Sequence, residues 1–156
     1  MQVYLIRHAD AVPEDDAGAD HYRWLSGRGR EAARGLARLL REQGVLLDAI
    51  ISSPLPRAIQ TAELVANGLD FIAPIQVHAS LQPGGHPRPV ALALPTYGVS
   101  IAVVGHEPGI SMLGAYLIGK PSFPQLRTAQ CCAIVDGATT FTARTDLMQI
   151  VPLLVE

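Results

Sequence analysis

The sequence predicts an α/β fold: a three-layer α/β/α sandwich around a mostly parallel sheet, closed by an antiparallel hairpin near the C-terminus. Short strand-like runs alternate along the chain with segments whose apolar residues recur at helical spacing. The run at residues 100–104 is nearly all apolar and β-branched, as in a parallel strand covered on both faces, and Pro108 opens a helix after it. Residues 129–135 and 139–144 flank the turn residues Asp136-Gly137, which predicts the hairpin.

The N-terminal part of the chain predicts a strand, a loop and a helix. Residues 1–6 form the strand, and the polar residues 11–22, with a proline and a glycine, form a surface loop at the same sheet edge as Arg7. Ser26 is a suitable N-cap for the helix, which ends at Gly44. Its apolar face consists of Ala32, Ala33, Leu36, Leu39 and Leu40.

The middle of the chain repeats this order. Residues 46–51 predict a second buried strand, and Pro56 suits the first turn of a second helix. Residues 75–81 predict another short strand, and residues 82–87 contain too many glycines and prolines to be anything but a loop. A short helix over residues 91–94 is expected to follow.

The composition sets the broad class. With 156 residues, 49% of them hydrophobic, residues 1–156 can form one domain with a core of its own. The net charge of −2 gives no general attraction to nucleic acid or to an anionic membrane. We see no signal peptide and no apolar run of about 20 residues, so we expect a soluble, cytoplasmic protein. The adjacent Cys131 and Cys132 suit buried thiols in a reducing compartment.

Polar side chains follow three of the predicted strands. Arg7-His8 follows the first strand, Arg57 lies in the first turn of the helix after the second, and His106 follows residues 100–104. Because the carboxyl ends of parallel strands meet at one edge of a sheet, we expect these side chains to converge. Two guanidiniums and two imidazoles suit a phosphoryl group, and an imidazole in line with phosphorus can attack it. We assign that role to His8.

Three motifs carry a resemblance to a known family. LIRHAD, SSPLPRAIQTA and VVGHEPG, in this order, resemble the signatures of the histidine phosphatase superfamily, and the match runs through most of the chain. The short length, the RxLSxxGR-like stretch at residues 23–30 and GHEPG are most similar to the SixA-type phosphohistidine phosphatases. The resemblance implies a phosphoglycerate mutase-like fold, with Arg7, Arg57 and His106 as phosphate ligands and His8 as the nucleophile. It also implies a metal-independent phosphatase without a cofactor.

The sequence departs from the family pattern at two places. Ala9 stands where the superfamily usually has glycine, which removes little room. Many SixA-like sequences have a glutamate in the segment that here reads Ser-Leu-Gln-Pro-Gly-Gly, residues 80–85. Asp10 and Glu107 are therefore the two nearby candidates for a proton donor. A protonated imidazole leaves without a dedicated acid, whereas an alkoxide needs a proton, so the missing glutamate favours phosphohistidine as the substrate.

Other polar clusters have ordinary structural interpretations. The spacing of His21, His78 and His86 matches no zinc pattern, so we interpret them as surface histidines. The first predicted helix carries five arginines, which we interpret as a solvated face, with docking of an acidic partner protein as the alternative. These are Arg28, Arg30, Arg34, Arg38 and Arg41.

The expected function is hydrolysis of phosphohistidine on a protein, such as a histidine phosphotransfer domain, through a phosphohistidine intermediate on His8. About twenty residues separate Leu81 from Ile101, too few for the large lid that encloses a small metabolite. One alternative is a small-molecule phosphomonoesterase or mutase-like enzyme on the same scaffold. The other is a phosphate-binding module without catalytic activity.

Overall fold

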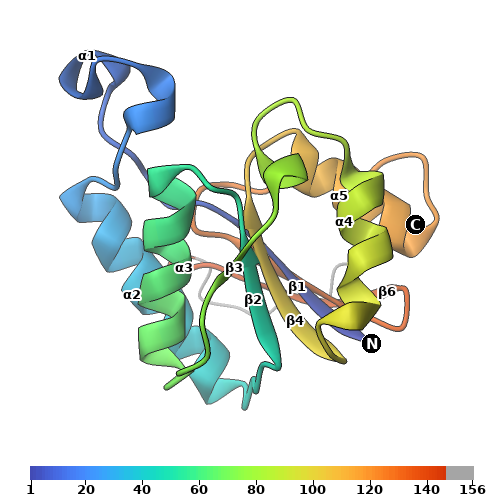
Figure 1. Cartoon of the computed structure of the whole chain (residues 1–156). Coiled ribbons are helices and arrows are strands. Elements are labelled where there is room, and N and C mark those ends of the chain that lie inside the picture. The colour runs from blue at the N-terminus through green and yellow to red at the C-terminus, as the bar shows by residue number, and fades with distance from the viewer. Residues whose placement is uncertain (147–156) are drawn as a thin grey trace.

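The computed structural model describes residues 1–146 as a six-stranded sheet between two layers of helices (Figure 1). The predicted α/β sandwich is therefore confirmed. The strands are β1 (Gln2–Arg7), β2 (Ala49–Ser52), β3 (Gln76–Val77), β4 (Ser100–Gly105), β5 (Cys131–Val135) and β6 (Ala138–Ala143). The α-helices are α1 (Glu14–Ala17), α2 (Gly27–Glu42), α3 (Pro56–Gly68), α4 (Pro87–Ala93) and α5 (Gly109–Ile118). Short 3₁₀ helices cover Asp20–Tyr22, Ala79–Leu81 and Leu94–Thr96.

The sheet has the strand order β3-β2-β4-β1-β5-β6. The first four strands in this order pair in parallel, while β5 pairs antiparallel with β1 and forms the predicted hairpin with β6. The hairpin turn falls on Asp136 and Gly137, whose φ angles of 49° and 79° are those of the two-residue turns that match strand twist. The sheet is mixed, as predicted, with its antiparallel part at the C-terminal side.

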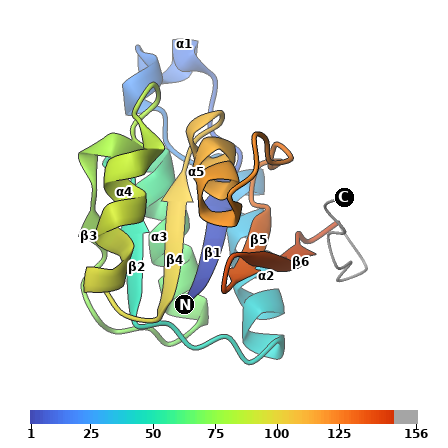
Figure 2. The ribbon, with the colours of Figure 1, turned by 90° about the vertical axis from the view of Figure 1, so that its right-hand side faces the viewer.

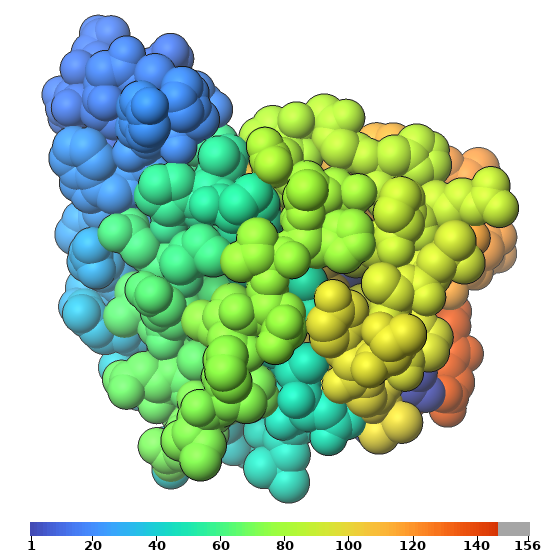
Figure 3. Space-filling view, viewed as in Figure 1, coloured from blue at the N-terminus to red at the C-terminus, as the bar shows by residue number. Residues whose placement is uncertain are grey.

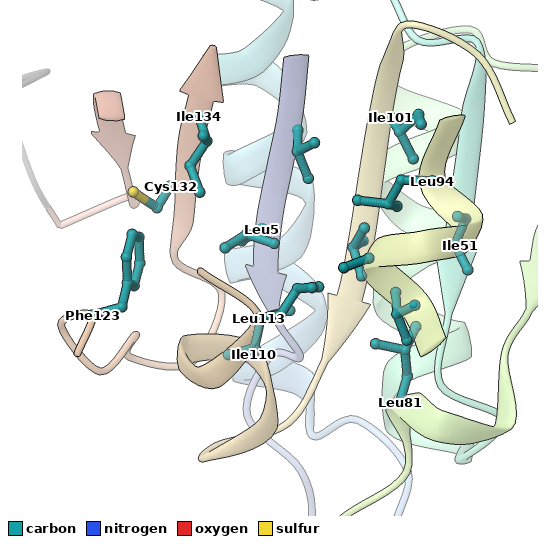
Figure 4. Close-up of a cluster of buried hydrophobic side chains, with 14 of the residues drawn as sticks. Leu5, Ile51, Leu81, Leu94, Ile101, Ile110, Leu113, Phe123, Cys132 and Ile134 are labelled. Atoms are coloured by element: carbon teal, nitrogen blue, oxygen red, sulfur yellow. The ribbon is translucent and has the colours of Figure 1, made fainter. Parts of the chain in front are cut away.

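Alternate residues of the central strands face opposite helical layers. Leu5 and Val103 belong to the core under α4 and α5, which Figure 4 shows, while Ile6 and Val104 belong to the core under α2 and α3. Figure 2 shows α4 and α5 together on one side of the strands. Because both faces are covered, the parallel strands are apolar at nearly every position, which is the signal that identified them.

Several element boundaries differ from the sequence prediction. The second strand begins at Ala49, not at residue 46, because Leu46 is exposed and the carboxylate of Asp48 accepts the N–H groups of Val99 and Ser100 at the sheet end. The strand predicted at residues 75–81 ends at Val77, after which a 3₁₀ turn begins.

The helix expected at residues 91–94 instead starts at Pro87, because the His86 ring accepts the Arg88 N–H and caps it. The loop predicted at residues 82–87 is shorter by one residue as a result. The predicted loop at residues 11–22 contains α1 and the 3₁₀ turn Asp20–Tyr22. In the space-filling view this segment stands out from the body of the molecule at the upper left (Figure 3).

The start of α2 is packed tightly against the end of β1. Ser26 caps the helix, as predicted, by accepting the Gly29 N–H at 3.0 Å. A Cβ atom on Gly29 would lie 2.0 Å from the carbonyl oxygen of Asp10, whereas a Cβ atom on Gly27 would meet nothing within 4 Å. The glycine at position 29 therefore allows the helix to approach the residues that follow β1.

Gly29→Ala should lower the free energy of unfolding by about 2–3 kcal/mol, because a backbone carbonyl cannot move aside as a side chain can. The matched variant Gly27→Ala should leave stability unchanged or raise it slightly. Urea unfolding of both variants measures this. Equal stabilities for the two variants would contradict the close approach.

Candidate active site

A cavity of about 460 Å³ opens where β1 and β4 end. It brings together the predicted residues from all three motifs, which are Arg7, His8, Asp10, Arg57, His106 and Glu107. Its remaining walls come from Ala11, Asp20, Arg23, Pro83 and Thr128. The six predicted site residues therefore lie together, although they come from three separate regions of the chain.

The register of the parallel strands sets this arrangement. Arg7 of β1 lies opposite Gly105 of β4, so the two strands end level, and the His8 N–H continues the ladder to the Gly105 carbonyl at 3.0 Å. The next residue on each strand is a histidine. The ring centroids of His8 and His106 are consequently 5.0 Å apart.

His8 is held in one tautomer. Its Nδ1 lies 2.7 Å from the carbonyl oxygen of Ala9, and because a carbonyl only accepts, Nδ1 must carry the proton. The lone pair is then on Nε2. The pKa of His8 is lowered to about 4, chiefly by burial and further by the positive charges of Arg57 and Arg7, which together outweigh the opposing effect of the Ala9 hydrogen bond. His8 is therefore neutral near pH 7, with a free ring nitrogen.

The Nε2 atom of His106 lies 2.8 Å from the Ser53 hydroxyl, which also accepts the Leu55 N–H. A hydroxyl can donate to a bare Nε2 or accept from a protonated one, so this contact fits both neutral tautomers of His106. Burial is the largest cause that lowers the pKa of His106 to about 3, and repulsion by His8 in its protonated form and by Arg57 adds to it. His106 is therefore neutral near pH 7, and its Nδ1 is a donor in the tautomer in which Ser53 donates to Nε2.

The two predicted arginines are fixed by backbone carbonyls. Arg7 donates from Nη1 to Leu126 at 2.9 Å, and Arg57, only 4% exposed, donates from Nη1 to the carbonyl of Asp20 at 2.7 Å. Within residues 1–146, three buried nitrogen atoms of the cavity residues have no partner: Nε of Arg7, Nε of Arg57 and Nδ1 of His106. Buried donors are normally satisfied, and one tetrahedral oxyanion offers enough acceptor oxygens for all three.

The two predicted proton-donor candidates are bound to the scaffold. Glu107 accepts the Leu126 N–H with one carboxylate oxygen and the Ser111 hydroxyl with the other. Asp10 accepts the Ser26 hydroxyl and pairs with Arg28. Burial alone would raise the pKa of Asp10, but these two hydrogen bonds outweigh it and hold the pKa below its ordinary value.

Three residues that were given no site role from the sequence, Asp20, Ser53 and Thr61, help to shape the cavity. Asp20 binds Arg57 and Arg23, and Ser53 binds His106. Thr61 accepts the Ala9 N–H and donates to the Arg57 carbonyl, which ties the end of β1 to α3. The four-residue spacing from Arg57 to Thr61 on a helix was a usable signal. For Asp20 the only signal in the sequence was its place in a loop at the same sheet edge as Arg7.

The remaining histidines and cysteines lie outside the cavity. His78 and His86 each cap a short helix by accepting a backbone N–H, and the ring of His21 packs at a tilt against the ring of Tyr22. In the described part of the chain, no group of three or more metal-binding side chains is present. Cys131 and Cys132 are free and buried in β5, and burial raises the pKa of Cys132 to about 12.

Comparisons with known proteins identify the family of this chain. A family model, Histidine phosphatase superfamily (branch 1), matches residues 3–83. Phosphohistidine phosphatase SixA of Escherichia coli (strain K12) is 33% identical over 138 residues, covering 86% of this chain and 84% of that protein. The chain belongs to the histidine phosphatase superfamily, is of the SixA type, and is a phosphatase.

Solved structures and a more distant relative extend the comparison. The structure of the protein histidine phosphatase SixA complexed with tungstate has a TM-score of 0.86 and 28% identity, covering 93% of this chain and 97% of that one. Alpha-ribazole phosphatase from Shigella flexneri shares the fold, with a TM-score of 0.69 and 20% identity over 97% and 96% of the two chains. The mitochondrial serine/threonine-protein phosphatase Pgam5 of Drosophila virilis is 33% identical over 87 residues, 56% of this chain and 29% of that protein.

The lowered histidine pKa values predict acid sensitivity. Below about pH 6.5 the unfolded chain binds protons at His8 and His106 that the folded protein does not, so the free energy of unfolding should fall as the pH is lowered towards 4. For His8 alone the loss between pH 7 and 4.5 should be on the order of 2 kcal/mol. Urea unfolding of the wild type and His8→Asn at both pH values checks this, and the same pH dependence in both proteins would contradict it.

Proposed function

We propose that this phosphatase hydrolyses phosphohistidine on a protein substrate through a covalent intermediate on His8. The observation that carries the proposal is the neutral, Nδ1-protonated ring of His8 beside the unpartnered Nε–H groups of Arg7 and Arg57 and the unpartnered Nδ1 of His106. The ring supplies a nucleophilic nitrogen, and the donors suit the oxygens of a phosphoryl group. The SixA structure solved with tungstate, another tetrahedral oxyanion, supports this choice of ligand.

In the first step, Nε2 of His8 attacks the phosphorus of the substrate. The new N–P bond forms with the Nε2 lone pair, the substrate's own P–N bond breaks, and its electron pair passes to the departing imidazole. His8 becomes a phosphorylated imidazolium whose Nδ1–H remains bonded to the Ala9 carbonyl. Arg7, Arg57 and His106 donate to the equatorial oxygens as negative charge develops there.

In the second step, water attacks the phosphorus of the intermediate. The P–N bond breaks, its electrons return to Nε2, and the proton that water loses passes to the phosphate product. His8 is restored as the Nδ1–H tautomer. The strongly lowered pKa of this ring makes it a good leaving group, since the neutral form is the one that the buried site favours.

The departing imidazole removes the need for a strong acid. Asp10 and Glu107 line the cavity, but the oxygens of both carboxylates already accept hydrogen bonds from neighbouring elements. We propose that they hold the cavity wall in place, and that phosphohistidine is cleaved without a dedicated proton donor. An alkyl phosphate would depend on one of the two for its leaving oxygen.

The segment between the 3₁₀ turn at Leu81 and β4 favours a protein-borne substrate. It forms α4 and a 3₁₀ turn, and Val90 and Leu94 are buried in the core. Residues used in this way cannot close over a small metabolite, so the cavity is open to a side chain presented by another protein. We propose a histidine phosphotransfer domain as that partner, and the cytoplasm, where free thiols persist, as the compartment.

His8→Ala should abolish turnover and the covalent phosphoenzyme, because no other neutral imidazole in the cavity has a free Nε2. Rapid quenching with a labelled phosphohistidine protein and analysis of the trapped peptide measure both effects. His78→Ala, which removes a histidine outside the cavity, should retain both. A labelled residue other than His8 would contradict the mechanism, and binding without turnover or labelling in the wild type would favour a phosphate-binding module.

The substrate class is tested by comparing kcat/KM for a phosphorylated histidine phosphotransfer domain with kcat/KM for sugar phosphates. We expect the phosphoprotein to be preferred by at least about a hundredfold, since an alkoxide leaving group lacks the advantage of imidazole. A preference for the sugar phosphates would instead identify a small-molecule phosphomonoesterase.

A further inference from the structure

The carboxylate of Asp20 accepts hydrogen bonds from inside the cavity, unlike the other two carboxylates that line it. Asp20, at the start of the 3₁₀ turn after α1, accepts Arg57 Nη2 at 3.1 Å with one oxygen and Arg23 Nη1 at 3.1 Å with the other. Both of these arginines line the same cavity. Asp10 and Glu107, by contrast, are bonded to residues outside it. The Asp20 side chain is also half-exposed, so its oxygens can accept further hydrogen bonds.

The contacts of Asp20 leave a defined edge of Arg57 free. Its backbone carbonyl and its carboxylate take Nη1 and Nη2, whereas Nε has no partner among the described residues. A bidentate oxyanion can therefore use the Nε edge without displacing Asp20. The carboxylate would then remain beside the bound phosphoryl group, as a negative charge in a cavity wall that carries three arginines, Arg7, Arg23 and Arg57.

We propose that the Asp20 carboxylate binds the leaving group of the substrate and selects a phosphorylated imidazole over a phosphomonoester. This inference rests on the proposed phosphohistidine phosphatase activity. The ring of a protonated phosphohistidine carries an N–H on the nitrogen that is not phosphorylated, which can donate to Asp20. A phosphomonoester has no equivalent donor on its leaving oxygen, and a substrate with a carboxylate beside its phosphate is repelled.

The hydrogen bond also fits the electron flow of the first step. The P–N bond electrons neutralise the imidazolium as it departs, and the N–H facing Asp20 stays on the ring throughout. No proton is transferred, so Asp20 acts as an ionised acceptor and not as an acid. Burial opposes ionisation, but the hydrogen bonds and charges of Arg23 and Arg57 hold the pKa of Asp20 below its ordinary value.

The test compares two small substrates that differ in their leaving group: N-phosphoimidazole and 4-nitrophenyl phosphate. Any effect of Asp20 on Arg57 alters both substrates alike, because both present the same phosphoryl group. Asp20→Asn and Asp20→Ala should lower the ratio of kcat/KM values, phosphoimidazole over 4-nitrophenyl phosphate, by about tenfold or more. Asp20→Glu should retain most of the ratio, and Asp15→Asn, an exposed change in α1, should keep it in full.

The possible failures are distinguishable. Suppose that the wild type prefers phosphoimidazole and that Asp20→Asn leaves the ratio of the two kcat/KM values unchanged. That result would overturn only the proposed role of Asp20 in binding the leaving group, and Asp20 would then be a positioning residue for Arg57. A wild type that hydrolyses 4-nitrophenyl phosphate but not phosphoimidazole would overturn the proposed function as well. Circular dichroism of each variant ensures that the ratio is measured on folded protein.

Discussion

The parallel pairing of β1 with β4 is the constraint on which the site depends. Because Arg7 lies opposite Gly105, both strands end at the same level and the following histidines are brought side by side. A shift of one residue would separate the two rings and would also turn the apolar residues of β1 to the wrong helical layer. The core that fixes the register therefore also fixes the distance between His8 and His106.

Burial then determines the chemistry of these two rings. In water an imidazole is partly protonated near neutral pH, but beside two arginines and beneath the protein surface both rings are held neutral. The partners differ in kind: the Ala9 carbonyl faces His8 and the Ser53 hydroxyl faces His106. The first ring thus exposes a lone pair as a nucleophile, and the second has an unpartnered Nδ1. Asp20 adds a negative charge to a wall that is otherwise suited to anions.

The sequence was sufficient to predict the layers, the mixed sheet and the convergence of four site residues, which are Arg7, His8, Arg57 and His106. These features depend on strand periodicity and on motifs that directly follow strands, and both are local signals. Asp20 was not predictable, because its contact with Arg57 spans 37 residues and depends on how the segment after β1 folds back. The contacts of Asp10 with Arg28 and of Glu107 with Leu126 were hidden for the same reason, whereas Ser111 lies only four residues after Glu107. Burial and hydrogen-bond partners, more than residue type, distinguish a candidate acid from a structural carboxylate.

The tautomer and charge of His8 in the free protein are the most direct test of this account. Long-range ¹H–¹⁵N correlation spectra of the imidazoles, recorded near pH 6 and assigned with His8→Asn, report which ring nitrogen carries a proton. We expect a neutral His8 ring protonated on Nδ1, with a pKa of about 4 on titration. An Nε2-protonated ring, or an imidazolium at that pH, would remove the nucleophilic lone pair and contradict the proposed mechanism.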